Sequence, residues 1–178
     1  MSVPSSPVVE VNDIEKFGGQ YDELWGDISP CYDCAVVRDA SYLNWKYVDQ
    51  PGQSFVRLEV TRDGQLIGCV ILSVSDPDHV YQYRRTHVID IVTSTEPEYL
   101  YPLISAAVNR SRELSADAVF MHLINSEIQQ ALENVGFLKR SPTRYLMVST
   151  QTRADHERLL NPAQWLITHG DSDIDRPW

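Results

Sequence analysis

The chain has 178 residues, 43% of them hydrophobic, and a formal net charge of −10. This length and composition predict one sizeable core and exclude a disordered or fibrous chain, while the acidic balance argues against nucleic acid or an anionic membrane surface as a partner. Three cysteines are too few for a disulfide framework. Without signal-peptide features or an apolar run of membrane-spanning length, we expect a soluble, cytoplasmic protein.

The N-terminal part is expected to be irregular at first and then helical. Residues 1–20 begin with a Ser- and Pro-rich run and predict a flexible leader. The domain is expected over residues 21–150. Residues 151–178 predict a C-terminal extension that packs on this domain. A short helix is predicted over residues 21–28. A second, aromatic helix starts at a cap, Asp39 or Ser41, and stops before a proline.

The middle of the chain predicts strands and one long helix. Two β-rich runs, residues 54–62 and 65–74, flank Asp63-Gly64, a dipeptide that favours a tight hairpin. A strand over residues 86–93 then leads into a helix whose apolar residues recur every three or four positions, which favours packing on a sheet.

The following segments complete an α/β pattern. Residues 118–123 predict a buried strand, residues 126–135 a helix ended by Gly136, and residues 144–149 a final strand. A hairpin is antiparallel and a strand–helix–strand crossover is parallel, so the sheet is expected to be mixed.

The order of these elements and the run NSEIQQALENVGF resemble the GNAT superfamily of N-acetyltransferases from about Phe55 to Val148. Asn125 stands at the asparagine of a motif of that family. The resemblance implies a mixed, mainly antiparallel central sheet with helices on both faces, and an active cleft between the strands that end at Val92 and His122. The runs RDASYLNWKY and QWLITHGDSD resemble, more loosely, the degenerate C-terminal lobe of two-lobed acetyltransferase-like proteins.

The start of the long helix departs from the family pattern. In GNAT enzymes this junction carries Arg/Gln-x-x-Gly-x-Gly/Ala, whose N–H groups hold the pyrophosphate of acetyl-CoA. Here residues 95–100 read Thr-Glu-Pro-Glu-Tyr-Leu, with a predicted capping box between Thr95 and Glu98. Each carboxylate would repel a pyrophosphate by about 1 kcal/mol or more. The family's proton-donating tyrosine is replaced by Leu132.

Three hypotheses about function follow. The first is a GNAT-like domain with a degenerate acetyl-CoA site that serves as the companion or substrate-side lobe of an acyltransferase, with no cofactor expected. The alternative is an active N-acyltransferase that binds acetyl-CoA in an atypical way and acts on an amine or amino sugar. The third is a non-catalytic dimerisation scaffold. Whether the chain is an enzyme stays open, and its expected partner is another lobe or a second copy.

Five residues are candidates for a site within this framework. Asn125, Asp90 and Glu59 are candidate catalytic residues, and Val92, His122 and Asn125 are candidate cofactor-binding residues. For Asp90 the favoured explanation is a satisfied polar group at a sheet margin, and Glu59 is also explained as a solvent-facing or arginine-paired carboxylate.

Strict alternation along the strand predicts which face of the sheet each candidate occupies. It places Asp90 on the same face as Val88 and Val92. His87, Ile89 and Ile91 fall on the opposite face. Glu59 falls on the polar face of its own strand.

No metal site is predicted. Cys31 and Cys34 form a C-x-x-C pair, but the sequence has no second such pair and no closely spaced pair of histidines. Asp171, Asp173 and Asp175 lack the later glycine and glutamate of a calcium loop.

Overall fold

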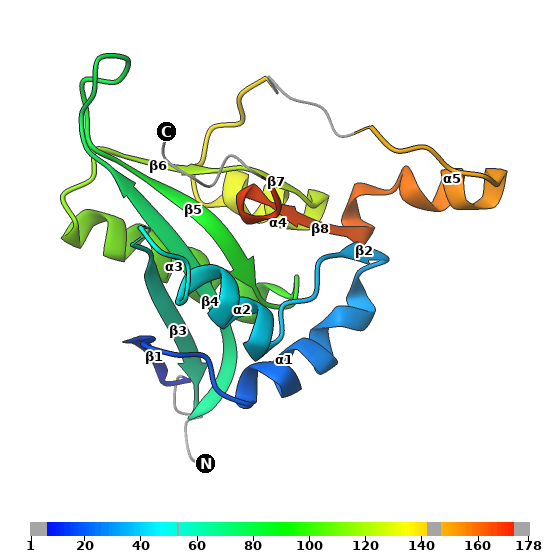
Figure 1. The fold of residues 1–178 in the computed structure, drawn as a ribbon, viewed down its shortest axis with the longest axis horizontal. Coiled ribbons are helices and arrows are strands. Elements are labelled where there is room, and N and C mark those ends of the chain that lie inside the picture. The colour runs from blue at the N-terminus through cyan, green and yellow to red at the C-terminus, as the bar shows by residue number, and fades with distance from the viewer. Residues whose placement is uncertain (1–6, 53, 142–146, 173–178) are drawn as a thin grey trace, which may run out of the picture.

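The structure is a computed structural model that describes residues 7–52, 54–141 and 147–172. A five-stranded sheet forms its centre (Figure 1). The strands, in spatial order, are β1 (Val9–Asp13), β3 (Val56–Arg62), β4 (Gln65–Ser75), β5 (Arg85–Val92) and β6 (Ala118–Met121). The first four strands pair antiparallel, whereas β5 and β6 pair in parallel. The predicted mixed, mainly antiparallel sheet is confirmed.

The hairpin between β3 and β4 turns at the predicted dipeptide. Asp63 and Gly64 both have positive φ angles, of 51° and 80°. A two-residue turn with two positive φ angles matches the right-handed twist of the flanking strands. Asp and Gly adopt that conformation more readily than other residues, so the local sequence determines this connection.

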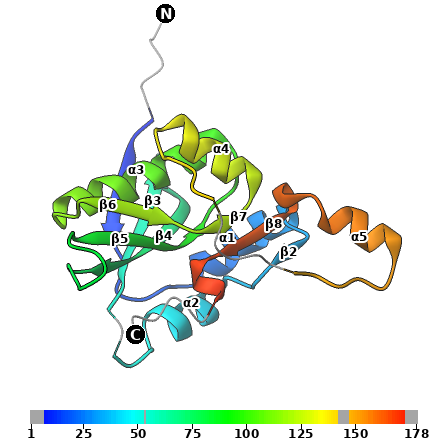
Figure 2. The same ribbon diagram turned by 90° about the horizontal axis from the view of Figure 1, so that it is seen from above.

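Helices cover both faces of the sheet, as the resemblance implied. The four helices that do so are α1 (Gln20–Ile28), α2 (Ala40–Tyr47), α3 (Pro97–Glu113) and α4 (Ser126–Asn134). Leu103 of α3 and Ile128 of α4 belong to one core cluster, and Tyr21 of α1 and Leu43 of α2 belong to another. In Figure 2, α3 and α4 lie on one side of the sheet, and α1 and α2 lie on the other.

A second, three-stranded sheet joins distant parts of the chain. Its order is β2 (Cys34–Ala35), β8 (Trp165–Thr168) and β7 (Leu123–Ile124). Short 3-10 helices precede β2 and lie on either side of β8: η1 (Ser29–Cys31), η2 (Pro162–Gln164) and η3 (His169–Asp171). The predicted strand over residues 118–123 is thus split at His122 into β6 and β7. Helix α5 (Arg153–Leu159) lies to one side of both sheets (Figure 1).

The two ends of the domain differ from the prediction. Val9–Asp13 was expected in a flexible leader, but it forms β1 and pairs with β3 over five residues. All five residues are exposed, so β1 has no buried face of the kind that helps to predict a strand from the sequence. The predicted strand over residues 144–149 lies partly outside the described residues, and residues 147–149 are not strand. Among the described helices, none has both the length and the apolar character needed to cross a membrane.

Candidate functional site

Strand β5 contains a β-bulge at Ile89. Two consecutive residues of β4 pair with Val88 and Asp90, so Ile89 is an extra residue on its strand. Ile89 packs in the core cluster of α1 and α2, and the carboxylate of Asp90 accepts a hydrogen bond from Tyr47 of α2. Val88 packs in a different cluster, with Ala107 of α3. The prediction is therefore wrong relative to Val88 and Ile89, because the bulge interrupts the alternation, whereas Asp90 and Val92 lie on the same face as predicted.

Beyond the bulge the two parallel strands separate. The pairing of β5 with β6 ends at Val88 and Met121, after which β7 pairs with β8 instead. We call the space between residues 89–93 and β7 the divergence region. The resemblance to GNAT enzymes placed the cofactor cleft there.

Side chains from both ends of the chain fill the divergence region. Tyr32, which follows η1, and Leu166 of β8 have exposed fractions of only 8% and 0%, and both pack in the core cluster that contains Ile91. The Tyr32 hydroxyl donates a hydrogen bond to the carbonyl oxygen of Thr93 at 3.0 Å. The region is thus part of the hydrophobic core.

Two backbone groups at the end of β5 are also satisfied internally. The carbonyl of Val92 faces Gly68 of β4. Because successive residues of a strand direct their backbone groups to opposite edges, Ile91 and Thr93 direct theirs toward the divergence region. The Ile91 N–H donates to Asp90 Oδ1 at 3.0 Å, and the Thr93 carbonyl accepts from Tyr32. Neither group is available to a ligand without a rearrangement.

Helix α3 begins without the predicted capping box. Glu96 is the N-cap residue and makes no side-chain cap, and Pro97 at the first helical position has no N–H to donate. Glu98 does not reach back to Thr95. Its carboxylate instead accepts a hydrogen bond from Arg62 of β3 at 2.7 Å. Glu98 therefore pairs with Arg62 and does not cap the helix.

Leu132 occupies a closed environment. Its exposed fraction is 7%, and it lines a cavity of about 10 Å³ together with Leu103 and Phe137. A cavity of that size has room for roughly one water molecule. A leucine among apolar side chains offers no proton donor at this position.

A buried ionic network centres on Arg38. The guanidinium Nε lies 3.1 Å from both carboxylate oxygens of Asp90, and Nη2 donates to Asp171 at 2.6 Å. Thr168 Oγ1 donates to Asp90 at 2.9 Å. Burial lowers the pKa of Arg38, but the two carboxylates outweigh this and raise it above its ordinary value. Burial also raises the pKa of Asp171.

The network positions η3 against the sheet. Thr168 and Asp171, at the two ends of η3, both bond to Arg38. Gly170 lies so close to Tyr47 and Ile89 that a Cβ atom there would collide with the tyrosine hydroxyl. These contacts fix η3 beside the bulge of β5.

Two of the predicted catalytic residues make structural hydrogen bonds. Asp90 is wholly buried and accepts from Arg38, Tyr47 and Thr168. Asn125 is also wholly buried, and it caps α4. Its Oδ1 accepts from two helix N–H groups and its Nδ2 donates to two carbonyls near β8, which uses its full hydrogen-bonding capacity.

The remaining predicted residues are not gathered into one site. Glu59 is half-buried on β3 and accepts a hydrogen bond from Tyr21 at 3.2 Å. Because β4 separates β3 from β5, Glu59 lies roughly 10 Å from the β5 backbone. Val92 is fully buried in the core. His122 is exposed between β6 and β7.

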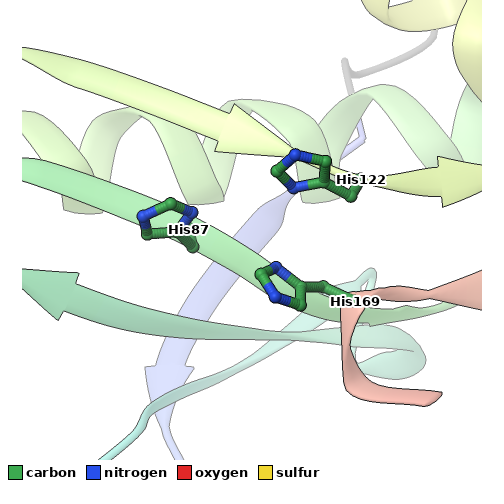
Figure 3. Close-up of side chains that lie close together, drawn as sticks. All are labelled: His87, His122 and His169. Atoms are coloured by element: carbon green, nitrogen blue, oxygen red, sulfur yellow. The ribbon is translucent and has the colours of Figure 1, made fainter. Parts of the chain in front are cut away.

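His122 belongs to a cluster of three histidines from three separate elements. His87 lies on β5, His122 follows β6, and His169 begins η3; Figure 3 shows their rings directed toward one another. One nitrogen from each ring lies within 4.8 Å of the other two. The ring centroids of His122 and His169 are 5.1 Å apart, and the ring of His87 stacks on Phe120 at 5.5 Å.

His87 is held in its neutral form. Burial, followed by the nearby His169, Arg85 and His122, lowers its pKa to about 4. A neutral imidazole at physiological pH can accept a hydrogen bond or bind a metal ion. The cluster is therefore a candidate site for ligand chemistry.

Sequence reasoning missed most of this arrangement. Arg38 and His169 were not singled out, and the search for metal ligands required pairs close in sequence. The available signal was weak: His87 and His122 each lie on a strand predicted to flank the cleft. No local pattern linked either one to His169, because η3 reaches them through the tertiary fold.

Comparison with known proteins supports the fold. No protein-family model and no curated protein matches the sequence. The structure is similar to a ribosomal-protein-alanine N-acetyltransferase from Brucella melitensis biovar Abortus 2308, with a TM-score of 0.58 and 15% identity over 80% of this chain and 99% of the other. It is also similar to a Trypanosoma brucei acetyltransferase, with a TM-score of 0.54 and 17% identity over 79% and 100% of the two chains.

A third similar structure contains a cofactor analogue. AAC(6')-Iy, in complex with the bisubstrate analogue CoA-S-monomethyl-acetylneamine, has a TM-score of 0.51 and 12% identity over 80% of this chain and 99% of the other. At these identities the similarity concerns the arrangement of elements. The similarity covers about 80% of this chain and nearly the full length of each of the three structures. The chain has the fold of the GNAT acetyltransferases.

Proposed function

We propose that this chain is a GNAT-fold domain whose own acetyl-CoA site is degenerate, and that it serves as the companion or substrate-side lobe of an acyltransferase. The observation that carries the proposal is the filled divergence region. Leu166 and Tyr32 are buried in one core cluster with Ile91, and a GNAT-like binding mode would require the space beside this strand for the cofactor.

Emptying that region would destabilise the fold. Exposing a buried leucine costs about 1.5–3 kcal/mol, and moving Tyr32 would also break its hydrogen bond to Thr93. The affinity of acetyl-CoA would be reduced by these costs. A preformed cofactor cleft has no such cost, so the filled region supports loss of binding.

The start of α3 opposes the cofactor independently. Glu96 is exposed and the Glu98 side chain is 52% exposed, at the helix end where a pyrophosphate would need N–H donors. Pro97 supplies no donor. The Arg62–Glu98 pair leaves little net positive charge to attract an anion.

Calorimetric titration of the full chain with acetyl-CoA tests the proposal. We expect no saturable heat up to about 1 mM, because the cofactor must overcome both obstacles. The E96Q/E98Q variant removes the charges but leaves Leu166 in place, so it should not bind either. Saturable binding with a Kd of about 10 μM or tighter would overturn the proposal.

A turnover assay separates the proposal from its alternative. The isolated chain should release no CoA from acetyl-CoA with a panel of amines and amino sugars, measured by thiol detection. Release above the uncatalysed rate would instead favour an N-acyltransferase with atypical cofactor binding. Binding and turnover together thus distinguish a degenerate domain from an active enzyme.

The surface of α2 supports a role in association. Trp45 has an exposed fraction of 57%, and its ring lies 5.8 Å from that of Tyr42. Tryptophan and tyrosine are enriched where proteins bind one another. If the partner is a second copy, sedimentation equilibrium should show dimers that W45A weakens; a strictly monomeric chain would leave a different lobe as the proposed partner.

A further inference from the structure

We propose that His87, His122 and His169 form a binding site for a divalent transition-metal ion, with Zn²⁺ as the ion of first choice. All three residues are close enough for one ligand nitrogen each to face a common centre. The inference does not depend on the proposed function, because it uses none of the residues that carry that proposal.

The distances suit coordination after a small adjustment. The three nitrogens lie within 4.8 Å of one another. Zinc–nitrogen bonds of about 2.0–2.1 Å in a tetrahedral arrangement place ligand nitrogens roughly 3.3 Å apart. Rotation of the exposed His122 side chain, together with slight ring movements, can supply the difference.

The backbone around each histidine is already fixed. His87 lies within the paired part of β5, and His122 follows the last paired residue of β6. His169 is held by η3, whose ends bond to Arg38 and whose Gly170 packs against Tyr47. Ligands held by rigid elements lose little entropy when the ion binds.

One ring nitrogen of the cluster has a specific need for a partner. Nδ1 of His87 is buried and makes no hydrogen bond within the described part of the chain. An unsatisfied buried polar atom is uncommon and calls for an explanation, such as an ion. Coordination by His87 would remove the cost of burying that nitrogen.

The chemistry of the donor set determines the choice of ion. Three imidazoles suit zinc, copper and nickel, whereas magnesium and calcium prefer oxygen ligands. Three protein ligands also leave one position of a tetrahedral zinc ion open for water or another ligand. Because His122 is exposed, solvent can reach that position.

Metal titration of the C31S/C34S chain tests the site. Cys31 and Cys34 are free cysteines, and replacing them removes competing thiol ligands. Calorimetry with ZnCl₂ should show one ion per chain, and Co²⁺ should give the intense visible absorption of a four-coordinate complex. Zinc should raise the Tm, with reversal by EDTA and no comparable effect of Mg²⁺.

Single substitutions assign the ligands. H87N, H122N and H169N should each weaken Zn²⁺ binding by at least about tenfold, whereas H79N and H156N, at the other two histidines, should not. H122N is the most informative variant because His122 is exposed and its replacement leaves the core intact. Absence of saturable binding to the C31S/C34S chain, or undiminished affinity in a folded H122N variant, would overturn the proposal.

Discussion

The Nε atom of Arg38 lies 3.1 Å from both carboxylate oxygens of Asp90, and both side chains are completely buried. The two residues are 52 positions apart in the sequence. Their pairing joins the segment after β2 to the bulged part of β5, and through Thr168 and Asp171 it also joins both to η3.

Replacing Arg38 with methionine should destabilise the fold strongly. The R38M variant keeps much of the side-chain volume but leaves two buried carboxylates without their cation, which costs about 3–5 kcal/mol. Urea unfolding measures the change. As a matched control, R153M removes the exposed pair of Arg153 with Glu157 and should cost less than about 0.5 kcal/mol. Equal effects of the two substitutions would contradict the importance of the buried network.

Replacing Asn125 with alanine should destabilise the fold without any involvement of a ligand. N125A loses the cap of α4 and two hydrogen bonds to carbonyls near β8, for a total of about 2 kcal/mol or more. The exposed Asn109 on α3 is the control, and N109A should change stability little. If N125A unfolded at the same urea concentration as the original chain, the structural role given to this amide would be wrong.

The stability of the metal-free chain should depend on pH through His87. In the unfolded chain a histidine binds a proton near pH 6.5, but in the folded chain His87 does so only near pH 4. Between these values the unfolded state binds more protons, so stability falls as the pH decreases from 6.5 to 4 and the loss levels off below that.

The H87N variant isolates this contribution. The difference in unfolding free energy between the original chain and H87N, measured in EDTA, should change with pH over that window. A flat difference for H87N between pH 7 and pH 4 would show that the pKa of His87 is not lowered.

Replacing Gly170 with alanine should displace η3. The added Cβ meets the hydroxyl of Tyr47 and the backbone of Ile89, so η3 must move away from the sheet. We expect a loss of about 1–3 kcal/mol and weaker Zn²⁺ binding, because His169 moves with η3. G26A is the control, since Gly26 lies inside α1 with open space around it and alanine favours a helix. Unchanged stability and Zn²⁺ affinity in G170A would refute this close packing.

Shortening Leu166 should test the filled divergence region. L166A removes a wholly buried side chain and should cost about 2–5 kcal/mol in urea unfolding. Leu160 is a suitable control because its side chain is 66% exposed, and L160A should have little effect. Cofactor binding that appears in L166A would show that this leucine is the main obstacle to acetyl-CoA, ahead of the glutamates.

Local chemistry made much of the fold predictable. Asp63-Gly64 favours the tight turn that joins β3 and β4. Asp39 caps α2, as expected, by accepting a hydrogen bond from the Tyr42 N–H. The spacing of apolar residues in α3 identifies the buried face of that helix. Each of these features depends on residues within a few positions of one another. Their agreement with the structure follows from strong local preferences.

The site was less predictable because it depends on long-range contacts. A single extra residue at Ile89 reverses the face of Asp90, and no sequence pattern announces that bulge. Asn125 matched a family motif, yet its amide nitrogen donates hydrogen bonds to two backbone carbonyls near β8. Glu98 pairs with Arg62 of another strand, which local capping rules do not include.

The pairing of β2 with β8 also has a consequence for biosynthesis. Arg38 and Asp171 are 133 positions apart, and the ion pair between them forms only when nearly all of the described chain is available. During translation, residues 34–38 must therefore wait for β8 and η3, while the hairpin of β3 and β4 can form early from neighbouring residues. The histidine cluster would then be among the last parts of the molecule to assemble.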